Sequence, residues 1–123
     1  YSGLKSYGVA KTAQLLSMIK LKECFSGTGV TINAMHPGNV KTNSGKNNGK
    51  FYKLHKNLLV DRMARPITIA SESLYFLGVS KKVETISGRF FNLTTVEEPA
   101  PPALDREEAE KLWMLSLELG GLK

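Results

Sequence analysis

The feature that most constrains the fold is an apolar helical pattern that leads through a glycine turn into a short β-branched segment. Apolar side chains recur near helical spacing over residues 7–24. A turn follows at 26–29, in which Gly27 suits a left-handed cap conformation. Residues 30–35, Val-Thr-Ile-Asn-Ala-Met, predict a strand buried on both faces because they are rich in β-branched side chains and carry no charge. A helix, a tight turn and a buried strand make half of a βαβ unit, so the pattern predicts an α/β fold with a parallel sheet.

The rest of the chain adds two helices and one strand to this unit. A helix is expected over 66–77, because proline suits a first helical turn and Gly78 can end it. Residues 87–92 predict a second strand. The proline-rich segment 98–102 is expected to form neither helix nor strand. A final helix is expected to begin at Asp105 with an N-terminal capping pair.

Two strands and three helices are too few for an independently stable parallel sheet. The 123 residues show no internal domain boundary and suit one small domain or a piece of a larger one. We therefore expect a single partial domain, the C-terminal part of a doubly wound parallel sheet that lacks its N-terminal, phosphate-binding βαβ half.

Lysine follows tyrosine at a distance of four residues in three pairs: Tyr1–Lys5, Tyr7–Lys11 and Tyr52–Lys56. On a helix this spacing places both side chains on one face, where they can form a proton-transferring pair. An isolated phenol releases its proton only near about pH 10, and a nearby ammonium group favours the phenolate. The spacing alone is weak evidence, but only Tyr7–Lys11 begins the periodic helix that leads to the predicted strand. We therefore predict Tyr7 and Lys11 as the catalytic pair.

The dipeptide Pro37-Gly38 follows the predicted strand at its carboxyl end, which is the edge where open α/β sheets bind ligands. Proline ends strand pairing, and glycine lets a flat ring approach the backbone closely. The Thr42 hydroxyl, four residues after Gly38, can bond an amide or a phosphate. These residues predict a cofactor-binding edge beside Tyr7 and Lys11.

With these residues the chain resembles the short-chain dehydrogenase/reductase family, and most of all the branch that contains the retinol dehydrogenases. The resemblance covers essentially the whole chain and rests on the following runs: 7–11, 27–42, 87–91, 98–105 and 112–113. It implies a Rossmann-type sheet, NAD or NADP as the cofactor, and hydride transfer between that cofactor and a small carbonyl or alcohol substrate.

The resemblance also implies a role for each matched residue. Tyr7 would be the general acid/base, and Lys11 would favour its phenolate and hydrogen-bond the nicotinamide ribose, so both would contact the cofactor. The nicotinamide and its carboxamide would be bordered by Pro37, Gly38, Val40 and Thr42. Residues 43–65 would form the variable substrate loop over the site.

Two parts of the family pattern are absent from the sequence. It holds no Gly-rich strand-to-helix turn for a pyrophosphate, and the family's catalytic serine, expected upstream of Tyr7, is missing. We therefore expect the 123 residues alone to be inactive. The alternative interpretation is a non-catalytic fragment that only binds or self-assembles, because the predicted strand at Val30 lacks a neighbour on one side. A homo-oligomer is compatible with both interpretations.

The charge distribution suggests a third, weaker interpretation. The formal net charge of +6 is concentrated in residues 41–65, which hold seven lysines and arginines and a single carboxylate, Asp61. Such a segment can dock on nucleic acid or anionic membrane. It lacks the recurring aromatic residues and the motifs of nucleic-acid binders, so we expect a solvated loop followed by a short amphipathic helix, and no nucleic-acid partner.

The remaining signals exclude other classes of protein. Cys24 is the single cysteine, which excludes an internal disulfide and fits a reducing, cytoplasmic location; its place at the end of an apolar helix predicts a packed thiol. His36 and His55 have no partner at metal-ligand spacing, so no metal site is expected, and His36 is expected to pack or bond locally. No stretch approaches the roughly 18 to 20 apolar residues that span a bilayer.

Overall fold

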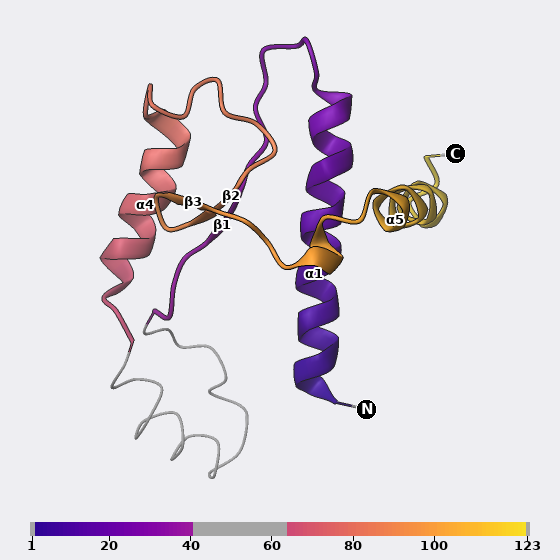
Figure 1. Ribbon diagram of the computed structural model, residues 1–123, viewed down its shortest axis with the longest axis horizontal. Coiled ribbons are helices and arrows are strands. Elements are labelled where there is room, and N and C mark those ends of the chain that lie inside the picture. Colours follow the sequence, from indigo (N-terminus) through magenta and orange to yellow (C-terminus); the bar gives the residue numbers. More distant parts are fainter. Residues whose placement is uncertain (1, 41–63, 123) are drawn as a thin grey trace.

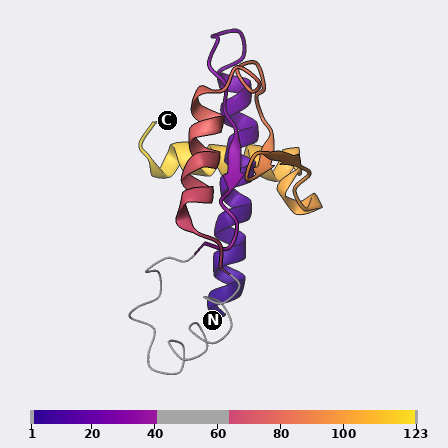
Figure 2. The same ribbon diagram turned by 90° about the vertical axis from the view of Figure 1, so that its left-hand side faces the viewer.

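The computed structural model places a small sheet between two helices, and it describes residues 2–40 and 64–122 (Figure 1). Helix α1 (Gly3–Cys24) lies on one side of the sheet and α4 (Ile67–Val79) on the other. Helix α5 (Arg106–Leu119) crosses α1 on the side away from the sheet. Figure 2 shows the same layers from the α4 side, with α4 in front of the sheet and α1 behind it. The predicted α/β class is confirmed.

Three short strands form a mixed sheet in the order β1-β2-β3. Strand β1 (Ala34–His36) pairs parallel with β2 (Phe90–Asn92), so that Met35 lies opposite Phe91. Strand β2 pairs antiparallel with β3 (Thr95–Glu97). The predicted parallel pair is confirmed, and the prediction of a purely parallel sheet is wrong.

The turn between β2 and β3 explains why the sequence does not predict the third strand. Leu93 adopts a φ of 58°, in the left-handed region that residues other than glycine rarely occupy. Two-residue hairpin turns usually carry Asn-Gly or Asp-Gly, and Leu93-Thr94 carries neither. The Leu93 amide donates to the His36 carbonyl oxygen at 3.0 Å, which holds the turn against the end of β1.

Strand β1 is shorter and more exposed than the sequence predicts. Instead of a doubly buried strand over 30–35, the ladder begins at Ala34, and Val30 is 50% exposed. The segment before β1 is fixed by a side chain, since the Ile32 amide donates to the Ser87 hydroxyl at 3.1 Å. Among the described residues β1 lies at the edge of the sheet, which explains why the segment leading into it is partly exposed.

The helix boundaries match the predictions in part. Helix α1 begins at Gly3 rather than Tyr7, and Gly27 adopts the predicted left-handed conformation with a φ of 78°. Helix α4 continues through Gly78, so the predicted glycine stop is wrong; the Ser80 amide closes the last turn.

The prediction that the Cys24 thiol is packed inside the protein is also wrong. Cys24 is exposed, because the last turn of α1 extends past the crossing with α5 (Figure 1).

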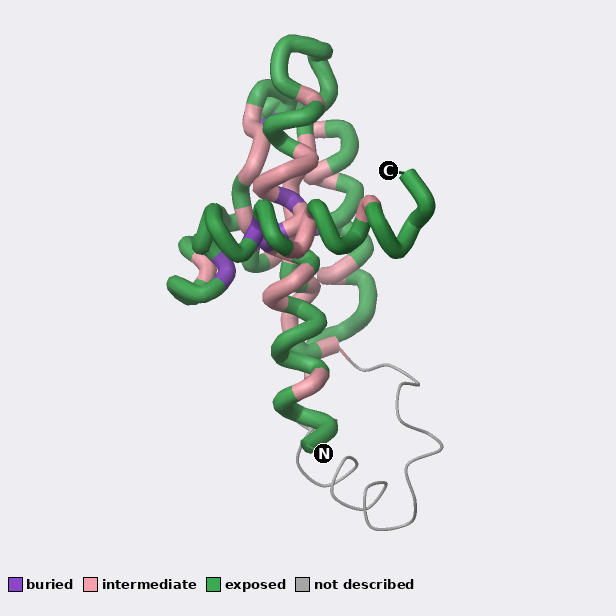
Figure 3. The backbone as a smooth tube through the Cα atoms, turned by 90° about the vertical axis from the view of Figure 1, so that its right-hand side faces the viewer, coloured by how far each residue is buried: buried purple, intermediate pink, exposed green. Residues whose placement is uncertain are grey.

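Most of the buried residues gather where the sheet, α1 and α5 meet, and Ser73 and Val83 are buried on α4 and just after it (Figure 3). Phe91, on the central strand, is 1% exposed. Leu16 and Met18 of α1 and Ala109 of α5 are buried as well. The predicted irregular proline segment instead contains a 3₁₀ turn, η2 (Pro101–Ala103), because prolines are tolerated in a first helical turn, where an amide has no partner.

Polar groups fix α5 against α1. The Asp105 carboxylate accepts from the Glu107 and Glu108 amides at 2.9 and 3.0 Å, which confirms the predicted helix start. The Glu108 side chain accepts from Lys111 rather than reaching back to complete the capping pair. Between the helices, the Lys20 ammonium lies 2.6 Å from the Glu110 carboxylate. The hydrogen bonds that the Lys20 ammonium donates to Glu110, and then to Glu23, raise the pKa of Lys20.

Candidate active site

The first part of the candidate site is the Tyr7–Lys11 pair on α1. The two side chains lie on one face of the helix, and the Lys11 ammonium nitrogen is 5.6 Å from the centroid of the Tyr7 ring. The ammonium group also donates to the Gln14 side-chain oxygen at 3.0 Å. Tyr7 is 64% exposed, so its hydroxyl is accessible to a ligand. The structure thus forms the pair that the helical spacing predicts.

The second part is the turn that follows β1. Gly38 adopts a φ of 75°, which an L side chain rarely adopts. A Cβ atom at this position would lie 3.6 Å from Leu93 Cδ2, so the backbone of the turn also lies close to the β2–β3 hairpin. Glycine is therefore required here by the backbone conformation of the turn.

A cavity of about 580 Å³ joins the two parts. Five of the six predicted site residues line it together: Tyr7, Lys11, Pro37, Gly38 and Val40. The sixth, Thr42, lies outside the described residues, as does nearly all of the predicted substrate loop at 43–65. The end of that segment returns to the turn, where the Arg65 amide donates to the Asn39 carbonyl oxygen at 2.7 Å.

The walls of this cavity suit a flat ring beside polar donors. Leu15, Met35 and Phe90 contribute apolar surface. The Tyr7 hydroxyl and the Lys11 ammonium group line the same cavity. This arrangement can hold an apolar ring system and deliver a proton to an oxygen atom at its edge.

His36, which was expected to pack or bond locally, lines the cavity as well. It is exposed at the carboxyl end of β1, so the structure does not show the packing that was one part of this expectation. Gln14 and Asn39 line the cavity too and were not predicted. Gln14 lies one helical turn after Lys11, at a spacing that a helix brings together, so that signal was present in the sequence.

Neither a metal-binding cluster nor a membrane-spanning helix is found in residues 2–40 and 64–122. No group of three histidine, cysteine or acidic side chains in this part of the chain could hold a metal ion. The described helices include none with the length and apolar character needed to cross a bilayer.

The sequence is similar to those of known dehydrogenases. The chain is 31% identical to retinol dehydrogenase 13 of Mus musculus over 99% of its own length and 38% of that protein. It is 36% identical to retinol dehydrogenase 14 of Homo sapiens over 94% of its length and 35% of that protein. The chain belongs to the short-chain dehydrogenase/reductase family.

The similarity reaches other short-chain dehydrogenases/reductases. The chain is 28% identical to short-chain dehydrogenase TIC 32 B, chloroplastic, of Brassica napus, over 97% of its length and 38% of that protein. It thus spans little more than a third of the curated relatives it matches. No family model matches the chain, and no solved structure matches it.

Proposed function

We propose that this chain is the proton-transferring, C-terminal part of an NAD(P)-dependent oxidoreductase that interconverts a carbonyl compound and an alcohol. The observation that carries the proposal is the shared cavity of Tyr7, Lys11 and the Pro37–Val40 turn. Family membership supports an oxidoreductase.

The cavity fits the nicotinamide end of such a cofactor. The backbone at Gly38 would lie against the flat ring, with Pro37 and Val40 beside it and Thr42 near the carboxamide. Lys11, already oriented by Gln14, would hydrogen-bond the ribose. When bound, the nicotinamide supplies or accepts the hydride.

The chain's own contribution would be the proton. In the reductive direction the Tyr7 hydroxyl gives its proton to the carbonyl oxygen as that oxygen gains negative charge, and the phenolate is left behind. In the oxidative direction the phenolate takes the proton from the alcohol. The Lys11 ammonium nitrogen, 5.6 Å from the ring centroid, would attract the negative charge that develops on Tyr7 during this transfer.

The remaining parts of the site would come from the other half of a Rossmann-type sheet. Within residues 2–40 and 64–122, β1 has a strand neighbour on one side only, and its other edge suits pairing with a further parallel strand. That half would supply the pyrophosphate-binding turn and the catalytic serine, and without it the 123 residues would be inactive. Two of the relatives are named retinol dehydrogenases, so retinol and its aldehyde are the first substrates to test.

A labelling experiment tests this function. The full-length protein that contains this chain is incubated with NADPH or NADH deuterated at the transferable position, and with retinal and a panel of small aldehydes. We expect deuterium at the alcohol carbon of at least one product. The absence of transfer from both cofactors to every aldehyde, in a folded protein, would refute the proposal.

A further inference from the structure

A second cavity, of about 720 Å³, lies on the other side of the turn after β1. Its walls come from that turn, from Arg65 in the segment that leads into α4, and from the end of β2 with the β3 hairpin. It shares His36, Gly38 and Asn39 with the cavity of Tyr7 and Lys11. The two cavities therefore meet at one short stretch of backbone.

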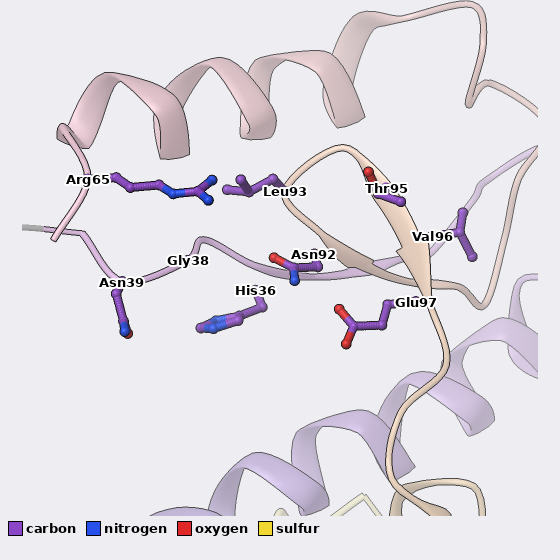
Figure 4. A pocket seen from close by; sticks show the side chains of 9 residues that line it. All are labelled: His36, Gly38, Asn39, Arg65, Asn92, Leu93, Thr95, Val96 and Glu97. Carbon is purple, nitrogen blue, oxygen red and sulfur yellow. The ribbon is translucent and has the colours of Figure 1, made fainter. Parts of the chain in front are cut away.

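The two cavities differ in chemistry. Apolar side chains such as Met35 and Phe90 line the first, whereas the second contains a guanidinium, a carboxylate and side-chain amides. Figure 4 shows Arg65 extending toward Leu93 from the segment before α4, and Glu97 extending from β3 toward His36. No ion pair joins Arg65 to Glu97, both of which are described, so the two charges remain separate within the cavity.

The position of Arg65 is fixed by the backbone. Its amide donates to the Asn39 carbonyl oxygen at 2.7 Å, and residue 65 forms a parallel β-bridge with Val40. The start of its side chain is thereby held at the wall that both cavities share. A guanidinium is charged at every physiological pH, and its planar fork matches the two oxygens of a carboxylate.

We propose that the second cavity is a specificity subsite, in which Arg65 binds a carboxylate at the far end of the carbonyl or alcohol substrate. This proposal rests on the proposed function of the first cavity. The reacting carbon would lie beside Tyr7, and the carboxylate would lie beyond Gly38 on the guanidinium, with the Asn92 amide as a further donor. Glu97, at the opposite end of this cavity, would repel the substrate carboxylate. This repulsion would favour binding of the carboxylate at Arg65 and would keep the affinity of the subsite modest.

Binding to the full-length protein that contains this chain tests the subsite without added cofactor or turnover. The probe is 4-(hydroxymethyl)benzoate, and benzyl alcohol is its uncharged match; binding is followed by the NMR shifts of the Gly38, Asn39 and Leu93 amides. We expect the carboxylate probe to saturate these shifts at about tenfold lower concentration than benzyl alcohol. Equal affinity for the two probes, or no saturable shift with the carboxylate, would overturn the proposal.

Two substitutions with opposite expected effects sharpen the test. Arg65→Gln should weaken binding of the carboxylate probe about tenfold, and Glu97→Gln should strengthen it about threefold by removing a repulsive charge. Arg89→Gln removes the same charge from an exposed position outside both cavities and should change the affinity by less than about twofold. Equal losses in Arg65→Gln and Arg89→Gln, or weaker binding in Glu97→Gln, would contradict the assignment. Hydride transfer plays no part in this readout, so the subsite and the proposed function can fail separately.

Discussion

Replacing Tyr7 with phenylalanine is expected to lower the turnover of the full-length protein by about 10²- to 10⁴-fold, the range that a general acid/base contributes. The substitution removes one oxygen atom and keeps the ring that lies 5.6 Å from the Lys11 ammonium. Because substrate binding does not depend on proton transfer, we expect kcat to fall and KM to change little. Steady-state kinetics with several aldehydes measures both.

Tyr75→Phe is the matched control for this substitution. Tyr75 is 71% exposed on α4 and does not line the cavity of Tyr7, so its hydroxyl has no role in the proposed chemistry. We expect the turnover of the Tyr75→Phe variant to equal that of the unsubstituted protein within about twofold. Unchanged turnover in Tyr7→Phe across the aldehydes would show that another group transfers the proton.

Replacing Phe91 with alanine is expected to lower the free energy of unfolding by about 3 to 5 kcal/mol. Phe91 is 1% exposed and lies on the central strand, between the parallel partner Met35 and the antiparallel partner Val96. Small domains are stable by only about 5 to 15 kcal/mol, so this loss removes a large share of the total. Urea denaturation followed by circular dichroism measures it.

Tyr75→Ala separates loss of the core from loss of any aromatic ring. It removes a ring from an exposed helical position and should cost less than about 1 kcal/mol. Phe91→Leu, which leaves a smaller void, should cost clearly less than Phe91→Ala and keeps the comparison measurable if Phe91→Ala does not fold. Equal costs for Phe91→Ala and Tyr75→Ala would show that β2 is not the centre of the core.

The local parts of the site were predictable from the sequence. The Tyr7–Lys11 pair depends on a spacing of one helical turn, and helical periodicity around it is strong. The Pro37-Gly38 turn was predictable for a similar reason, because each residue acts on its own backbone angles. Proline restricts φ at its position, and glycine permits the positive φ that the turn needs. Resemblance to the family then indicated that the helix and the turn belong to one site.

The parts that depend on distant contacts were not predictable. Strand β3 follows a turn with a left-handed Leu93, which local preferences disfavour. The exposure of β1 depends on which strand lies beside it, and a residue pattern cannot specify that neighbour. Arg65 reaches the turn through a bond to Asn39, a residue 26 positions earlier in the sequence, so nothing local marks it as part of a cavity wall.

The turnover of alcohol oxidation in a double-mutant cycle tests the central claim most directly, namely that Tyr7 and Lys11 act as one proton-transfer pair. The unsubstituted protein, Tyr7→Phe, Lys11→Met and the double variant are compared at saturating cofactor, with Lys5→Met, which replaces an exposed lysine of α1 outside the cavity, as the control. Because residues that act as a unit have non-additive effects, the double variant should lose about as much kcat as Tyr7→Phe alone. Lys5→Met should keep its turnover within about twofold of the unsubstituted protein. Losses of the two single variants that multiply in the double variant, in a protein that still binds its cofactor, would contradict the account.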